Sequence, residues 1–198
     1  MNYEVYQSVA PQSEAVALET AQAHCHIYTE EDDDFLNQLI AASREKTESI
    51  TRRQLITATW ELRARRWPRV NYIELPKPPL QEVTKVEYLD VNGDLVTMDP
   101  ALYSVVTKAA VGRISLKSGG QWPTAADEEG AIVVTYVAGY GDAASDVPKL
   151  LQQSILMRVA HWYVNRESTI AATLANIPDG PDRCDGLMRS HVTLNKGW

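Results

Sequence analysis

The residues that could do chemistry begin with the histidines and cysteines, and their tightest group is His24-Cys25-His26. Consecutive residues on a helix point about 100° apart, so these three side chains would not converge on one metal ion. On a strand His24 and His26 would share a face, but zinc needs three or four ligands, and no further pair follows at a recognised spacing. We therefore interpret the group as structural and expect neither a metal site nor a cofactor.

A nucleophile and base pair is the second possibility, formed by Cys25 or Cys184 with His161 or His191. Neither cysteine lies in a local signature of a cysteine hydrolase, and the G-x-S-x-G and H-E-x-x-H motifs do not occur. A small hydrolase using one of the cysteines remains an alternative. We expect that the chain is not an enzyme and has no catalytic residues.

Three consecutive acids, Asp32, Asp33 and Asp34, follow Thr29 and precede an apolar stripe with helical spacing. Calcium loops need a glycine and a terminal glutamate that this segment lacks. Acidic side chains are favourable in the first turn of a helix because they face the positive end of its dipole. The pattern predicts a helix over residues 30–48, which we call the acidic helix.

Arginines gather directly after this helix. Residues 51–70 hold six arginines and one acid, a net charge of +5, while residues 1–50 hold 10 acids and 2 bases, a net charge of −8. Such a patch could contact phosphates. We favour its pairing with the acidic block, within a subunit or between subunits, because the net charge of the chain repels DNA. We call these residues the Arg cluster: Arg52, Arg53, Arg63, Arg65, Arg66 and Arg69.

The whole chain has 198 residues and a net charge of −7, with 44% hydrophobic and 23% charged residues. These values are typical of a globular domain and exclude a disordered acidic tail. No apolar run approaches the roughly 18 residues of a membrane span, so we expect no membrane partner. With two cysteines and no basic, apolar leader at the N-terminus, we expect a protein made and assembled in a reducing cytosol with free thiols.

Changes in hydrophobic period divide the chain. Alternation from Ile56 to Ala64 indicates a strand, and Asn92-Gly93 between two alternating runs indicates a hairpin. We predict an α+β fold: a helical core of two N-terminal helices and one long C-terminal helix, an inserted small antiparallel β-sheet or sandwich, and an extended C-terminal tail. The predicted parts are an N-terminal helical part at 1–54, a β-rich insertion at 55–141, a long helix at 146–170 and the tail at 171–198.

The order of these motifs resembles a known family. The string WELRARRWPRVNYIELPKPPLQEVTKVEYLDVNGDLVTMDPALYSV, followed by VTYVAGYGDAASDVPKLLQQSILMRVAHWYVNRES, is similar to the central and later segments of tailed-phage head–tail connector (adaptor) proteins. The opening AVALETAQAHCHI with an acidic helix after it matches as well. The resemblance covers about residues 14–170, and prophages and phage-like gene transfer agents use similar particles.

The resemblance implies a structural protein of the virion or phage-like particle neck, assembled in the bacterial cytoplasm. It implies a homo-oligomeric ring, a dodecamer in the family, under the portal protein. Such a ring would extend the channel for double-stranded DNA without sequence readout, and would dock a tail-side connector or tail terminator protein. Family members bind the portal through their C-terminal segment, which corresponds here to residues 177–198, although the ending SHVTLNKGW departs from the family pattern. The candidate portal anchors are Ile177, Leu187, Met188 and Trp198.

Ring closure needs two different faces on each subunit, because head-to-tail contacts are heterologous. The acidic helix, with Asp32, Asp33 and Asp34, and the Arg cluster are our candidate pair for that contact, or for facing the DNA. The alternative function is a nucleic-acid-binding module acting through the cluster from Arg52 to Arg69.

Overall fold

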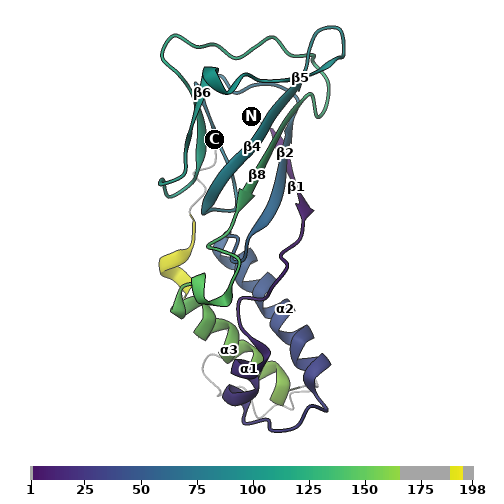
Figure 1. Cartoon of the computed structure of the whole chain (residues 1–198), viewed down its shortest axis with the longest axis vertical. Helices are drawn as coiled ribbons and strands as arrows, with labels where there is room; N and C mark the ends of the chain where they lie inside the picture. Colours follow the sequence, from purple (N-terminus) through teal and green to yellow (C-terminus); the bar gives the residue numbers. More distant parts are fainter. Residues whose placement is uncertain (1, 166–187, 194–198) are drawn as a thin grey trace, which may run out of the picture. The chain divides into compact units, whose positions relative to one another are not determined.

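The structure is a computed structural model of the chain and describes residues 2–165 and 188–193. Its elements fall into two compact units, each described here by itself. The β unit holds the described residues 2–12, 57–140 and 193, and the helical unit holds 13–56, 141–165 and 188–192. Three α-helices and two antiparallel sheets in the described ranges confirm the α+β class (Figure 1).

The β unit is a pair of antiparallel sheets. The larger has the order β1-β2-β8-β4-β5 and the smaller β3-β7-β6. A short 3₁₀ helix, η1 (Pro100–Leu102), precedes β6. The strands are β1 (Tyr3–Val9), β2 (Ala58–Ala64), β3 (Tyr72–Glu74), β4 (Leu80–Leu89), β5 (Leu95–Thr97), β6 (Tyr103–Val106), β7 (Arg113–Leu116) and β8 (Ile132–Ala138).

The core of the β unit comes from the inward residues of both sheets. Leu62, Val134 and Tyr136 of the larger sheet and Ile73 and Ile114 of the smaller one are buried in a single cluster. These positions alternate with outward ones along each strand, as the pleat requires. Burying a side chain of this size contributes about 1.5–3 kcal/mol, so the alternation read from the sequence is what holds the sheets together.

The predicted hairpin is confirmed between β4 and β5, whose residues Glu87–Leu89 pair with Leu95–Thr97. Gly93 has φ 87°, a conformation that glycine adopts without strain. The Asp90 carboxylate accepts hydrogen bonds from the backbone N–H groups of Asn92 and Asp94, at 2.8 and 2.9 Å. These bonds stabilise the charged form and lower the pKa of Asp90.

The helical unit contains α1 (Leu18–Cys25), α2 (Asp33–Thr51) and α3 (Lys149–Val164), with short 3₁₀ helices η2 (Ala144–Asp146) and η4 (Arg189–His191). Helix α2 buries Leu36 and Ile40, which are one turn apart. Helix α3 buries Leu151, Ile155 and Val159, again at helical spacing.

Buried polar groups join α2 to α3. Arg158 of α3 is 1% exposed, and its Nη1 donates to the Thr47 hydroxyl of α2 at 2.9 Å. The Ser43 hydroxyl donates to the Ile155 carbonyl oxygen at 3.3 Å. Hydrogen bonds of this kind offset the cost of burying polar atoms between the two helices.

Three element boundaries differ from the sequence analysis. Residues 3–9, assigned there to the N-terminal helical part, form strand β1 and pair with β2. Helix α2 begins at Asp33, with Asp32 as its N-cap, instead of near residue 30. The described part of the long helix spans Lys149–Val164, so Asp146 lies in η2 ahead of it.

Candidate assembly surfaces

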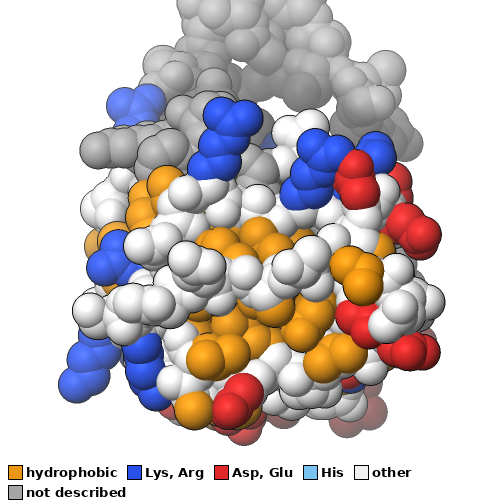
Figure 2. All heavy atoms as spheres, turned by 90° about the horizontal axis from the view of Figure 1, so that it is seen from above, with side chains coloured by type: hydrophobic (Ala, Val, Ile, Leu, Met, Phe, Trp, Pro, Cys, Tyr) orange, Lys and Arg blue, Asp and Glu red, His pale blue; other side chains and the backbone are white. Residues whose placement is uncertain are grey.

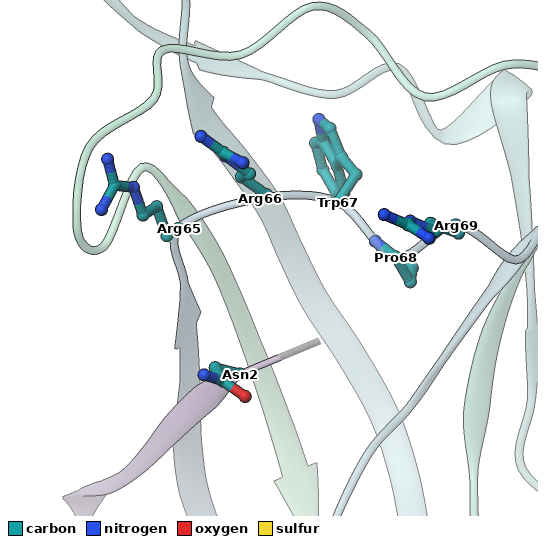
Figure 3. Close-up of a pocket in the computed structure, with 6 residues that line it drawn as sticks. All are labelled: Asn2, Arg65, Arg66, Trp67, Pro68 and Arg69. Atoms are coloured by element: carbon teal, nitrogen blue, oxygen red, sulfur yellow. The ribbon is translucent and has the colours of Figure 1, made fainter. Parts of the chain in front are cut away.

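The segment that follows β2 carries the densest positive charge of the β unit. A shallow hollow of about 420 Å³ lies there, lined by Asn2, Arg65, Arg66, Trp67, Pro68 and Arg69. Figure 3 shows the arginines and Trp67 along this one segment, with Asn2 projecting from the start of β1. The sequence Arg-Arg-Trp-Pro-Arg therefore builds a single basic surface, which we call the basic hollow.

An aromatic stack holds the segment in place. The rings of Trp67 and Trp122 are stacked with centroids 4.7 Å apart, and Tyr88 of β4 meets Trp67 edge-on at 6.0 Å. The Trp122 Nε1 donates to the Val70 carbonyl oxygen at 2.9 Å. Both tryptophans pack against the buried cluster of the sheets, so the arginines beside Trp67 are carried on a fixed support.

Asp127 neutralises much of this charge. Its carboxylate accepts hydrogen bonds from Nε of Arg65 at 2.7 Å and from Nε of Arg66 at 2.6 Å. The bonds from Arg66 and Arg65 hold the pKa of Asp127 well below its usual range. The neighbouring Ala126 N–H donates to the Leu89 carbonyl oxygen at 2.9 Å, which ties the Asp127 loop to the end of β4.

Arg69 is exposed, and no partner for it is found within residues 2–165 and 188–193. Of the three arginines in the basic hollow, it is therefore the one whose charge is not taken up by Asp127. A partner carboxylate or phosphate would meet Arg69 without first displacing an ion pair.

The rest of the Arg cluster lies elsewhere. Arg63 on β2 pairs with Glu61 at 2.7 Å and stands over the ring of Tyr6 at 5.6 Å. Arg52 is the exposed C-cap of α2, with φ 56°. Arg53 donates from Nε to the His191 carbonyl oxygen at 2.6 Å. Four arginines thus belong to the β unit and two to the helical unit.

The three acids of the acidic helix have different surroundings. Asp32 accepts a short hydrogen bond from the Tyr163 hydroxyl of α3, and Asp33 accepts one from Gln22 Nε2 at 2.6 Å. Asp34 is exposed in the first turn of α2. Their pairing with the Arg cluster stays a prediction for a contact between copies.

Of the candidate portal anchors, Met188 lies in the described residues and is 0% exposed. Ile177, Leu187 and Trp198 lie outside the described residues. As a portal anchor, Met188 would have to leave its buried position, so the portal-binding set stays a prediction.

The sites considered for chemistry are spread out. His24 and Cys25 belong to α1 and His26 is its C-cap, with φ 56°; among the described residues, no group of three His, Cys, Asp or Glu could hold a metal ion. His161 lies on α3 and His191 in η4. No helix in the described ranges is long and apolar enough to cross a membrane.

Exposed apolar side chains are a feature that the sequence analysis missed. Tyr3, Tyr6 and Val9 on β1 are 39%, 48% and 50% exposed, and Leu102 and Val105 at β6 are 43% and 38% exposed. Figure 2 shows a face where hydrophobic side chains gather, with Lys, Arg, Asp and Glu side chains around them. Apolar surface rimmed by charge is typical of faces that contact other proteins.

Among comparisons with known proteins, only the comparison with solved structures finds matches. No family model and no curated protein matches the chain. Solved structures do match over nearly the whole chain. A chain in the neck of an empty gene transfer agent (GTA) particle, computed with C6 symmetry, has a TM-score of 0.80 at 21% identity, covering 97% of this chain and 96% of its own length.

Two further structures agree. A chain of the virion of a native GTA particle has a TM-score of 0.78 at 22% identity, covering 98% of each chain. A chain in the neck of a native GTA particle, computed with C12 symmetry, has a TM-score of 0.74 at 21% identity, covering 97% and 96%. The chain thus has the fold of proteins from the neck and virion of gene transfer agent particles, consistent with its resemblance in sequence to head–tail connector proteins.

Proposed function

We propose that the chain is a structural head–tail connector (adaptor) protein of a phage or phage-like particle. The observation that carries the proposal is the full-length likeness to chains in GTA particle necks. The order of the sequence motifs and the fold both support this class. The proposed role is to form a ring beneath the portal, extend the DNA channel and dock the tail.

A ring of identical copies is supported by the symmetry of the similar structures. Their necks were computed with C6 and C12 symmetry, and both numbers fit a dodecamer. Ring contacts between the acidic helix and the Arg cluster would be heterologous, as closed rings require. Arg69 and Asp34, both exposed, are the members of the two sets best placed to meet a neighbouring copy.

The portal contact is proposed to run through residues 177–198. Deleting the whole segment is a poor test, because it would also remove the buried Met188 and the Arg53 contact with His191. A sharper pair of variants is deletion of residues 194–198 and the double substitution Ile177→Asp with Leu187→Asp. Either should abolish binding to the portal protein, in a pull-down from the same cells, while the unfolding curve of the free protein stays unchanged.

If both variants still bind the portal protein, the proposal that residues 177–198 make the portal contact is refuted. A matched control is Val91→Asp, since Val91 is 70% exposed at the β4–β5 hairpin. It introduces an aspartate in place of an apolar side chain outside the tail and should leave portal binding intact.

The basic hollow gives the nucleic-acid alternative its one supporting observation. If the chain is a nucleic-acid-binding module, the isolated protein should bind duplex DNA with an affinity that falls steeply as salt is added. The substitution Arg69→Glu should weaken that affinity. Asp127→Asn would strengthen it, because Arg65 and Arg66 would lose their carboxylate. Absence of salt-dependent binding in both the parent and Asp127→Asn would exclude this function.

A further inference from the structure

Strand β1 is an open edge of the larger sheet. It pairs with β2 on one side, and no described strand lies on its other side. Six of its seven residues are exposed, and Glu4 is its one charged residue. Natural proteins usually protect such edges with lysines, prolines or bulges, because unpaired N–H and C=O groups attract another strand. The sequence YEVYQSV has neither Lys nor Pro and bears apolar side chains. Its pairing with β2 has one irregularity, between Gln7 and Val9, so residues 3–7 form the regular part of the edge that is suited to pairing.

Strand β6 is a second open edge, in the smaller sheet. It pairs with β7 on one side and ends the order β3-β7-β6. Val105 on this strand and Leu102 just before it are partly exposed apolar side chains. The exposed Lys108 follows the end of the strand. Arg113 lies on the inner strand β7, opposite Val106, and stands over the ring of Tyr72 on β3 at 5.5 Å, so it does not belong to the open edge.

The two edges differ and lie on opposite sides of the β unit, as Figure 1 shows. A closed ring of identical subunits needs two different, complementary surfaces on each subunit. The β1 edge carries an acid and apolar side chains, Glu4 with Tyr6 and Val9. It is complementary to the β6 edge, which carries the apolar Leu102 and Val105 and is followed by the exposed Lys108. Each edge also has backbone N–H and C=O groups on its open side, with which the other edge can form hydrogen bonds.

We propose that β1 of one copy pairs with β6 of the next copy, joining the sheets of neighbouring subunits around the ring. This proposal rests on the proposed function, because head-to-tail pairing of identical copies leaves no open edge only when the copies form a closed ring. The occupant of the β1 edge is thus a second copy of this chain. A self-complementary dimer, with β1 against β1, would bring two Glu4 side chains to one interface and leave β6 uncovered.

The test is chemical cross-linking in assembled particles. The background carries Cys25→Ser and Cys184→Ser, and the test variant adds Tyr6→Cys and Val105→Cys, two exposed positions. Particles purified from cells that make this variant are treated with a short bismaleimide and run on a denaturing gel. We expect a ladder rising in steps of one chain mass, 22.1 kDa, because each copy offers both thiols to different neighbours.

The controls separate the other outcomes. Tyr6→Cys alone should stay monomeric, and dimers from it would show β1 against β1 and overturn the proposal. The pair Tyr6→Cys with Val91→Cys should give no ladder; a ladder equal to that of the test pair would also overturn it. If the test variant is present in particles but its two thiols do not cross-link, the edge contact is refuted and the connector function is not. Absence of the parent chain from purified particles would refute the connector function and the ring contact together.

Discussion

Arg44 gives the sharpest stability prediction, because it is a buried charge and one of its partners, Glu48, is buried as well. Its side chain on α2 is 9% exposed and meets Glu14 at 2.8 Å and Glu48 at 3.1 Å, with Glu48 10% exposed. Glu48 also accepts hydrogen bonds from Gln54 Nε2 at 2.8 Å and from the Leu55 N–H at 3.0 Å. The carboxylate is thus fixed in place and cannot turn outward to water when the arginine is removed.

Arg44→Met keeps most of the side-chain volume and removes the positive charge. Breaking a buried pair in this way costs about 3–5 kcal/mol, because it leaves a buried charge uncompensated. The matched control is Arg63→Met, whose pair with Glu61 is half-exposed at the arginine and should contribute at most about 1 kcal/mol. The assay is urea unfolding followed by circular dichroism at 222 nm, which reports on the three helices.

Repeating the urea titrations at several pH values tests whether the uncompensated charge of Glu48 causes the loss of stability. In Arg44→Met the folded pKa of Glu48 should be raised, so the loss of stability is fully present at neutral pH. It should shrink as the pH falls toward about 4, where the carboxyl group binds a proton. A loss no larger than that of Arg63→Met, or one that does not change with pH, would refute the reasoning.

Three further predictions concern other sites. Burial and the nearby Arg53 charge lower the pKa of His191 below its ordinary value of about 6.5. Stability should therefore rise as the pH rises toward that value, because below it the unfolded chain binds the extra proton. Urea titrations of the parent and of His191→Gln should show this slope in the parent and a smaller one in the variant. Trp122→Ala should lose the stacking on Trp67 and the bond to Val70, about 2–3 kcal/mol by tryptophan fluorescence on unfolding. Gly141→Ala would place a Cβ 2.2 Å from Asp146 Oδ2, and should lower the thermal midpoint by the equivalent of about 1–3 kcal/mol; an unchanged midpoint would contradict the close approach.

Sequence patterning predicted the elements whose signal is local. Alternation of apolar residues marked β2, where Leu62 and Ala64 are buried, and Asn92-Gly93 marked the β4–β5 hairpin. Both signals lie within a few residues and need no knowledge of the partner strand. Strand β1 gave no such signal, because its residues are almost all exposed and its partner β2 lies about 50 residues away.

The candidate site was predictable in composition but not in arrangement. The Arg cluster is evident in the sequence, yet Arg65 and Arg66 bind Asp127, which is more than 60 residues away. Two acids of the block that we expect to pair with the cluster, Asp32 and Asp33, accept bonds from Tyr163 and Gln22 within the helical unit. Pairing of the block with the Arg cluster between copies stays a prediction. Long-range pairs of this kind depend on how loops pack, which local spacing does not encode.

The central claim, a connector ring in the particle neck, is tested most directly by electron cryomicroscopy of particles from cells with and without this gene. The account predicts a symmetric ring between portal and tail in the parent particles, with density that fits the two sheets and three α-helices that residues 2–165 form. Without the gene, that density should be missing and the heads should lack tails. Particles without the gene that keep the same neck density and attached tails would contradict the claim.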